Sequence, residues 1–283
     1  MAGRTDGRIV VITGASAGIG AAASVELARL GAQVVPVGRD ARRLEGVARR
    51  ISSARNGAPA EPLRADFTSL DDVRGLARRL LDRHSRIDVL VNNAGAIFGR
   101  REVSADGHEL TFQVNHLAPF LLTNLLLDRL RASAPSRVVT TSSAAHTGGL
   151  VDLDDLELER GWSSWRAYAN SKLANVLFTR ELARRLDREE VVANCLHPGV
   201  IRSRLGRNMG GVVRGGWAIA RLFFASPQRG AATIVHLASS PEGQRVSGQY
   251  FIGTRPRTVV GQASDDFFAA ELWRASEELV GLR

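Results

Sequence analysis

The feature that most constrains the fold of this chain is a glycine-rich turn between a buried strand and a helix. Residues 8–13 form a continuous apolar run, which is typical of a strand buried in a parallel sheet. Residues 21–30 have helical spacing and end at Gly31. Glycines at such a turn let the backbone approach a pyrophosphate, which the helix N-terminus stabilises. We therefore expect a dinucleotide site at Gly14, Ser16, Gly18, Ile19 and Gly20.

Strand-like and helix-like segments alternate along the rest of the chain. Further strands are expected at 33–38, 61–65, 87–91, 136–141, 191–196 and 249–252. Further helices are expected at 68–84, 106–131, 165–186 and 263–282. This alternation predicts one α/β domain over residues 1–283: a doubly wound Rossmann-type fold with a mostly parallel sheet of about seven strands and helices on both faces.

Composition limits the compartment and the partners. The single cysteine, Cys195, excludes an internal disulfide and fits a reducing compartment. A strand that starts by Arg8 leaves no room for a signal peptide, and no run approaches the ~18 apolar residues of a membrane-spanning helix. The formal charge is +9, but the arginines are scattered as pairs among acids. We expect a cytoplasmic protein without stable membrane insertion and without a nucleic-acid partner.

Tyr168 and Lys172 form a second constraining feature. Lys172 is the only lysine among 38 basic residues, and it lies four positions after one of two tyrosines. Residues at i and i+4 share one face of a helix, so the ammonium and the phenol can converge on one ligand. A nearby cation lowers the pKa of a phenol, which would let Tyr168 exchange a proton near neutral pH. The alternative is a surface lysine beside a packed tyrosine.

The tip of the second expected strand bears on the choice of nicotinamide cofactor. An acid there accepts from the ribose 2′-hydroxyl of NAD(H), whereas a cation accommodates the 2′-phosphate of NADP(H). The chain has Gly38-Arg39 at this tip, and Asp40 is suited to cap the following helix. This pattern favours NADP(H) over NAD(H), with Arg42 or Arg43 as a further cation. An arginine that only faces solvent is the alternative.

Together with further motifs, these features resemble the short-chain dehydrogenase/reductase family over essentially the whole chain. The stretches VNHLAPFLLTNLLL, SKLANVLFTREL and HPGVIRS are similar to the retinol-dehydrogenase-like branch, which includes relatives of light-dependent protochlorophyllide reductase. Each motif is common, but the set in this order is specific. The motifs are Thr13-Gly14, Gly18-Ile19-Gly20, Asn92-Asn93-Ala94-Gly95, Asn115, Ser143, Tyr168 with Lys172, and Pro198-Gly199.

The resemblance implies four catalytic residues. Tyr168 would protonate the carbonyl oxygen during reduction, and Ser143, in preference to Ser142, would orient that oxygen. Lys172 would lower the pKa of Tyr168 and hold the nicotinamide ribose. Asn115 would hold a water that links Lys172 to solvent.

The resemblance also implies the cofactor-binding residues. Asp66 would face the adenine, and Asn93, Ala94 and Gly95 would lie beside the adenosine ribose. Hydride transfer needs no metal, and His116 and His197 are expected to be structural. The residues expected to pass the nicotinamide carboxamide are Pro198, Gly199, Val200 and Ser203.

Two segments are expected to shape the substrate site. Residues 144–164 are acidic and end near two tryptophans, and residues 204–226 mix glycine, arginine and bulky apolar residues. In the family, the second segment covers the substrate, and its composition favours a lipophilic or polycyclic small molecule. A helix packed on the core, or a contact with a membrane surface, are the alternatives for residues 204–226.

The expected reaction is hydride transfer between NADP(H) and a carbonyl or alcohol. A reductase of an activated carbon–carbon double bond is an alternative on the same fold, and a non-catalytic NADP(H)-sensing regulator is an alternative of another class. The regulator is disfavoured because all four catalytic positions are retained. The C-terminal segment completes the sheet or joins a partner subunit, so a homo-oligomer is possible.

Overall fold

The computed structural model of the protein describes residues 3, 5–199 and 226–283. In this part of the chain, eight strands form one sheet in the order β3-β2-β1-β4-β5-β6-β7-β8. Neighbouring strands are parallel except for β7 and β8, which are antiparallel. The strands are β1 (Ile9–Ile12), β2 (Gln33–Gly38), β3 (Leu63–Arg64), β4 (Val89–Asn92), β5 (Ser136–Thr141), β6 (Val191–His197), β7 (Tyr250–Ile252) and β8 (Arg255–Arg257).

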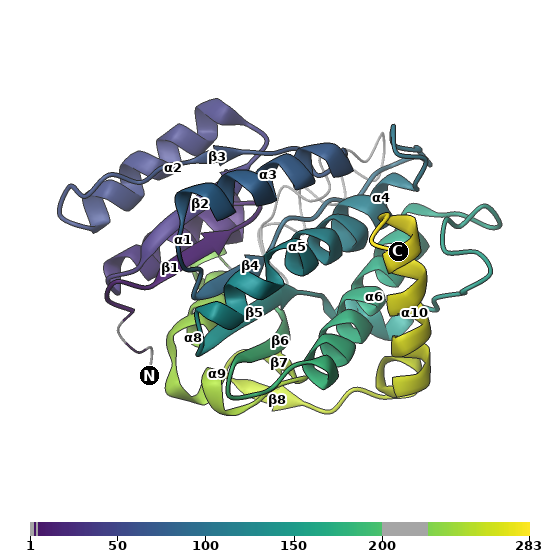
Figure 1. The fold of residues 1–283 in the computed structure, drawn as a ribbon. Coiled ribbons are helices and arrows are strands. Elements are labelled where there is room, and N and C mark those ends of the chain that lie inside the picture. The colour runs from purple at the N-terminus through teal and green to yellow at the C-terminus, as the bar shows by residue number, and fades with distance from the viewer. Residues whose placement is uncertain (1–2, 4, 200–225) are drawn as a thin grey trace.

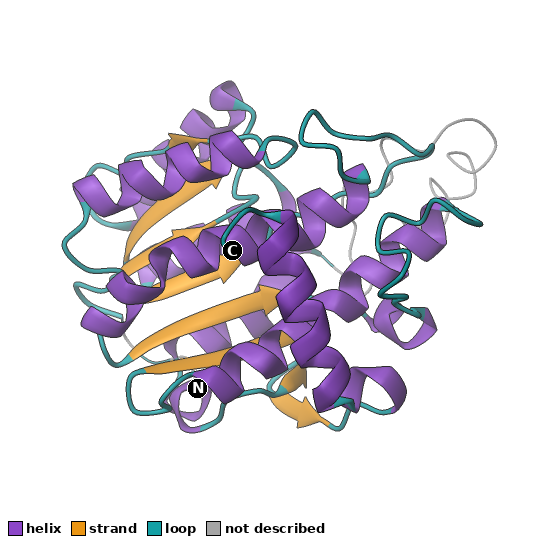
Figure 2. Ribbon diagram, turned by 45° about the vertical axis from the view of Figure 1, so that its right-hand side comes forward, coloured by secondary structure: helices purple, strands orange, loops and turns teal. Residues whose placement is uncertain are grey.

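Helices cover both faces of this sheet (Figure 2). One face carries α1 (Gly18–Arg29), α2 (Ala41–Ala54) and α8 (Pro227–Ser239). The other face carries α3 (Leu70–Arg83), α5 (Ala118–Ala132), α6 (Ser164–Arg185) and α10 (Asp266–Leu279). The remaining short elements are α4 (Leu110–Phe112), the π-helical η1 (Gln113–Leu117), the 3-10 turns η2 (Ala144–Gly148) and η5 (Gly261–Ser264), and α9 (Pro241–Arg245). The expected doubly wound α/β fold is confirmed, with one strand more than expected.

The central strands are buried on both faces, and this explains their continuous apolar sequence. In β1, Ile9 and Val11 pack into the core beneath α3, α5 and α6, whereas Val10 and Ile12 pack into the core beneath α1, α2 and α8. Side chains alternate between the two faces of a strand, so an uninterrupted apolar run is needed when both faces are covered. Because these strands run parallel, their carboxyl ends lie at the same edge of the sheet.

The helix expected over residues 106–131 is shorter and irregular in the structure. It begins at Leu110, because the Glu109 side chain caps it by accepting from the Phe112 N–H at 2.7 Å. Residues 104–108 instead form a tight loop with Gly107 at φ +91°. The chain then makes a π-helical turn, Gln113–Leu117, before α5 continues the path. Hydrophobic spacing revealed the helical segment but neither its cap nor its π turn.

Helices α8 and α9 and strand β8 were not expected from the sequence. Both helices begin with serine followed by proline: Ser226 accepts from the Arg229 N–H at 3.3 Å, and Ser240 accepts from the Gly243 N–H at 3.0 Å. Serine at the N-cap followed by proline at the first helical position is a helix-start signal that could have identified them.

Among the described residues, none of the helices combines the length and the apolar character that a membrane-spanning helix needs.

Helix α10 lies alongside α6 (Figure 1). Trp273 of α10 stacks on Phe178 of α6 at 5.8 Å between ring centroids and contacts Phe120 of α5 edge-on at 4.9 Å. Residues 167–179 of α6 are all buried, because η2, β6 and α4 pack on this helix as well as α10. The C-terminal segment thus supplies both a sheet strand, β7, and a helix that covers α6 of its own chain.

Candidate active site

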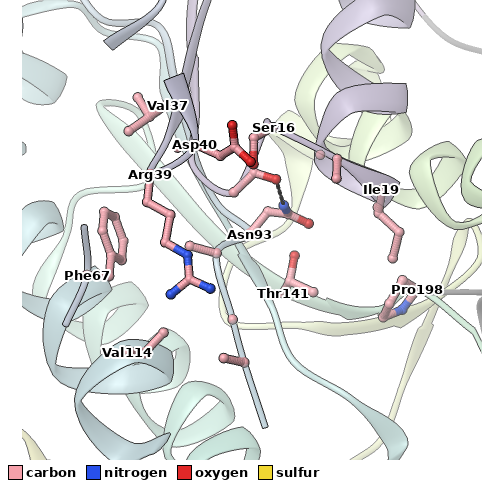
Figure 3. Close-up of a pocket in the computed structure, with 18 of the residues that line it drawn as sticks. Ser16, Ile19, Val37, Arg39, Asp40, Phe67, Asn93, Val114, Thr141 and Pro198 are labelled. Carbon is pink, nitrogen blue, oxygen red and sulfur yellow. Dashed lines mark hydrogen bonds between the residues drawn. The ribbon is translucent and has the colours of Figure 1, made fainter. Parts of the chain in front are cut away.

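A cleft of about 1210 Å³ opens at the carboxyl ends of the strands, and Figure 3 shows part of its lining. Asn115 is not among the lining residues, and the expected residues Val200 and Ser203 lie outside the described residues. The cleft nevertheless gathers most of the positions selected from the sequence. These are Gly14, Ser16, Gly18, Ile19, Gly20, Arg39, Asp66, Asn93, Ala94, Gly95, Ser143, Tyr168, Lys172, Pro198 and Gly199.

The glycine-rich turn forms one wall of the cleft. Gly14 and Gly18 adopt left-handed φ angles of +66° and +60°, which favour glycine. A Cβ on Gly20 would lie 2.5 Å from the Gly14 carbonyl oxygen, so this position has no room for a side chain. Ala17, at the N-cap of α1, makes no side-chain capping bond. The first amide groups of α1 therefore remain available at the cleft, and this arrangement fits a pyrophosphate.

Thr13 fastens this turn to the loop that follows β4. Its Oγ1 donates to the Val91 carbonyl at 3.2 Å and accepts from the N–H groups of Asn93 and Ala94, both at 3.0 Å. The Asn93 side chain returns a bond to the Thr13 carbonyl at 2.9 Å. The sequence marked Thr13 only as part of a motif. A residue with a hydroxyl group directly after a buried strand was the signal that could have identified Thr13 as a linking residue.

Arg39 extends into the pocket from the tip of β2 (Figure 3). No carboxylate among the described residues pairs with its guanidinium. Asp40 instead caps α2, as expected: its Oδ1 accepts from the Arg43 N–H at 3.1 Å, and its Oδ2 pairs with Arg43 Nε at 3.0 Å. Arg42 is exposed and does not line the cleft. Arg39 thus lines the cleft without a carboxylate partner in the described part of the chain, whereas Arg43 is paired with Asp40 and Arg42 lies outside the cleft.

Asp66 follows β3 at the same edge of the sheet. Its Oδ1 accepts from both the N–H and the hydroxyl of Thr68, at 3.1 and 3.0 Å. Its own N–H donates to Asp72 at 3.0 Å. These bonds hold the turn between β3 and α3 against the cleft.

Lys172 and Tyr168 lie on the same face of α6, and both are buried. Lys172 Nζ is 5.6 Å from the centroid of the Tyr168 ring and donates to the Thr141 carbonyl at 3.2 Å. A Cβ on Gly95 would lie 3.3 Å from Nζ, so the absence of a side chain there leaves room for the ammonium. Burial lowers the pKa of Lys172 to about 8.

The two serines after β5 face different ways. Ser142 is buried, and its hydroxyl donates to the Lys172 carbonyl at 2.7 Å. Ser143 lines the cleft together with Tyr168, and its hydroxyl lowers the pKa of the Tyr168 phenol. Strand alternation allows only one of two successive side chains to face a given side. The serine that lines the cleft beside Tyr168 is the one chosen from the sequence.

The pKa of Tyr168 is shifted in the direction opposite to the one expected. Burial raises the pKa of the phenol, and the hydrogen bond from Ser143 offsets only part of this rise. The sequence spacing correctly predicted that the two side chains share a helix face, but it carried no information on how deeply the phenol is buried.

Asn115 sits in the π-helical turn and joins three elements behind the cleft. Its Oδ1 accepts from the Ala96 N–H at 2.8 Å, and its Nδ2 donates to the Ala96 carbonyl at 3.0 Å and to Ser171 Oγ at 2.9 Å. Ala96 belongs to the loop after β4, and Ser171 precedes Lys172 on α6. A π turn inside an α-helix often accompanies a functional site. Asn115 thus ties the π turn to the loop and helix that carry cleft residues.

The two expected substrate-site segments differ in what the structure describes. No residue of 144–164 lines the described part of the cleft. This segment instead packs beside the C-terminal region, where Val151 and Gln262 exchange two hydrogen bonds of 2.8 Å. The expected lid over residues 204–226 lies, apart from Ser226, outside the described residues. The described residues hold no cluster of three or more His, Cys, Asp or Glu side chains suited to a metal.

Comparison with known proteins agrees with the geometry. The family model described as short chain dehydrogenase matches residues 8–211. Human retinol dehydrogenase 13 is 41% identical over 282 residues, which cover 98% of this chain and 85% of that protein. A protein of Streptomyces sp. (strain C5), provisionally named daunorubicin C-13 ketoreductase DnrU, is 44% identical over 280 residues, covering 99% of this chain and 94% of that protein.

Solved structures have the same architecture. An uncharacterised protein from Mycobacterium paratuberculosis superimposes with a TM-score of 0.79 at 36% identity, covering 99% of this chain and 96% of the other. A structure titled as the Pseudomonas aeruginosa RhlG/NADP active-site complex gives a TM-score of 0.70 at 30% identity, covering 87% of this chain and 94% of the other.

Proposed function

The chain belongs to the short chain dehydrogenase family, in its retinol-dehydrogenase-like branch, and from this premise we propose that it is an NADP(H)-dependent enzyme acting on a carbonyl or alcohol. Membership of the family makes it an oxidoreductase with a small-molecule substrate. The observation that carries the finer proposal is that Ser143, Tyr168 and Lys172 line one cleft with the glycine turn, and that Lys172 Nζ lies 5.6 Å from the centroid of the Tyr168 ring.

In this proposal, bound NADP(H) supplies or accepts the hydride. Tyr168 holds the transferred proton on its phenol oxygen. A carbonyl oxygen that gains negative charge needs hydrogen-bond donors, and the hydroxyls of Tyr168 and Ser143 provide two of them. The phenol of Tyr168 is protonated at neutral pH, so it can donate the proton that reduction requires. The Lys172 ammonium then stabilises the phenolate that remains.

The other residues of the cleft would hold the cofactor. Gly14, Gly18 and Gly20 let the backbone approach the pyrophosphate at the start of α1, and Arg39 would pair with the 2′-phosphate. Asp40 is already engaged by Arg43, so it is a poor acceptor for a ribose hydroxyl. This difference between the two side chains supports NADP(H) over NAD(H).

Apolar side chains in the cleft, and one beside Tyr168, favour a lipophilic or polycyclic substrate. Phe98 and Val114 line the cleft, and the exposed Trp165 lies 6.4 Å from the Tyr168 ring between centroids. By their names, two relatives act on retinol and on the C-13 ketone of daunorubicin, an alcohol and a ketone on large apolar frameworks. We therefore propose the same substrate class for this chain.

The first experiment replaces Tyr168 by phenylalanine. Without the phenol no proton can be donated, and we expect kcat for reduction of an apolar ketone to fall by on the order of 10²–10⁴-fold. The affinity for NADPH, measured by fluorescence titration, should change little. The matched control is Tyr250→Phe, because the buried Tyr250 hydroxyl has no hydrogen-bond partner among the described residues. Equal turnover in the two variants would contradict the proposed mechanism.

A second experiment reverses the charge at Arg39. Arg39→Asp should weaken NADPH binding by about 10- to 100-fold, because a charge-assisted bond is lost and a repulsive charge is added, and NADH binding should change far less. Arg42→Asp makes the same charge change outside the cleft and is the matched control. An NADPH:NADH preference that both variants leave unchanged would exclude Arg39 as the phosphate ligand.

A further inference from the structure

Two histidines flank Ser143 at the end of β5. His197 is the last residue of β6, and its Nδ1 lies 3.2 Å from the backbone nitrogen of Ala144. His146 lies in η2, and its Nδ1 is 2.7 Å from the Ser143 carbonyl oxygen. The Ser143 hydroxyl between them accepts from the Ala145 N–H at 3.2 Å. The peptide group that joins Ser143 to Ala144 is therefore held by one imidazole at its oxygen and by the other at its nitrogen.

The partners of the two rings determine where their protons are. A backbone N–H can only donate, so His197 must accept at Nδ1 and carry its proton on Nε2. A carbonyl can only accept, so His146 must donate from Nδ1. The bond made by His197 exists only while its ring is neutral, whereas the bond made by His146 survives protonation.

We propose that His197 is a positioning residue whose unprotonated Nδ1 holds the backbone of Ala144 and so keeps the Ser143 hydroxyl directed at Tyr168. The inference rests on the proposed catalytic roles of Ser143 and Tyr168. His197 lines the same cleft, but it acts on the reaction through the backbone at the start of η2. Its loss should displace Ser143 without removing any group that contacts the substrate.

The surroundings of His197 favour its neutral form. Among titratable groups, His146 in η2 acts electrostatically on His197, and Tyr168 and Lys172 of α6 line the same cleft. Tyr250 of β7 packs against the ring of His146. Burial, with a smaller contribution from His146, lowers the pKa of His197. The bond to Ala144 is therefore intact at neutral pH and is lost as the pH falls through this lowered pKa. Turnover should consequently decline on the acid side.

The test compares His197→Asn with His197→Leu. The Oδ1 of asparagine can accept from the Ala144 N–H in place of Nδ1, but it does not titrate; leucine cannot accept. We expect His197→Leu to lower kcat on the order of 10- to 100-fold, as misplacement of an active-site group does. His197→Asn should retain most of the neutral-pH kcat and lose the acid-side decline. His146→Asn should keep that decline, because the bond that His146 donates to the Ser143 carbonyl does not depend on a neutral ring.

A spectroscopic measurement separates this inference from the proposed function. Long-range ¹⁵N–¹H spectra of the wild-type protein, assigned with His197→Leu, should show the Nε2–H tautomer of His197 and a pKa below 6.5. An Nδ1–H tautomer, or an acid-side decline that persists in His197→Asn, would overturn the role of His197. Absence of Tyr168-dependent turnover in the wild type would instead refute the proposed function, and the tautomer would still decide whether His197 holds Ala144.

Discussion

Lys172 occupies a position where the shape of the cation matters as much as its charge. The side chain is 3% exposed, its Nζ reaches the Thr141 carbonyl, and it lies so close to Gly95 that a Cβ there would be 3.3 Å from Nζ. A guanidinium is planar and wider than an ammonium, so it cannot occupy the same position. We expect Lys172→Arg to lower kcat on the order of 100-fold. Steady-state kinetics should show Lys172→Met equally impaired, and an arginine variant close to wild type would mean that charge alone suffices.

At the residue scale, the pKa of Tyr168 is a property that the sequence could not predict. A spacing of four placed Tyr168 and Lys172 on one helix face, and the structure agrees. The environment of the phenol depends on Ser143 and on burial by segments far away in the chain. Such long-range packing leaves no local pattern in the sequence. The residue types were therefore predictable, but the direction of the pKa shift was not.

At the scale of elements, His108, in the loop before α4, joins the 144–164 segment to the end of α10. Its Nδ1 lies 2.8 Å from Glu157 Oε1, and its Nε2 lies 3.1 Å from the Leu279 carbonyl at the end of α10. Both partners are acceptors, so the doubly protonated ring satisfies them best. The bond to Glu157 is the main cause that raises the pKa of His108, and Asp106 adds to it. The side chain is thus a link that depends on its positive charge.

This link predicts how stability changes with pH. Because the folded pKa lies above 6.5, the stabilisation is complete below about pH 6.5 and is lost as the pH rises through the folded pKa. His108→Phe should therefore lower the melting temperature by several degrees at pH 6, at about 2–4 °C per kcal/mol for a chain of this size, and by less at pH 8.5. Thermal unfolding followed by circular dichroism at both pH values measures this difference.

His84→Phe is the matched control, because burial lowers the pKa of His84 instead of raising it. Its neutral form is favoured in the folded state, so its contribution is present above about pH 6.5 and is lost as the pH falls. The pH trend of the His84 variant should therefore have the opposite sign. The same trend for both variants would mean that the link through His108 does not depend on charge.

Elements were predictable from sequence where one local signal set their limits. Continuous apolar runs identified the central strands, because both faces of the sheet are covered. The π turn at Gln113–Leu117 was not predictable, since it depends on the bonds of Asn115 to Ala96 and Ser171. The short strand β8 was missed for a similar reason: Arg255–Arg257 pairs only with β7, and its sequence RPR has no strand-like pattern.

At the scale of the whole molecule, α10 makes the C-terminal segment part of the core that also supports α6. Trp273 is 4% exposed, packs on Phe120 and Phe178, and donates from Nε1 to Glu277 at 2.8 Å. Removing such a side chain leaves a cavity and costs about 3–5 kcal/mol. If residues 1–283 form one domain, Trp273→Ala should lower the urea midpoint of the entire protein, including the nucleotide cleft on the far side of α6.

Urea unfolding of Trp273→Ala, followed both by circular dichroism and by NADPH fluorescence, tests this expectation. Both signals should shift together, because the sheet that carries the cleft is packed against α6 and α5. The control on the same helix is Phe267→Ala, whose side chain is 73% exposed, and it should change the free energy of unfolding by no more than about 0.5 kcal/mol. NADPH binding that survives after the circular dichroism transition of Trp273→Ala would show that the C-terminal segment unfolds separately from the nucleotide-binding part.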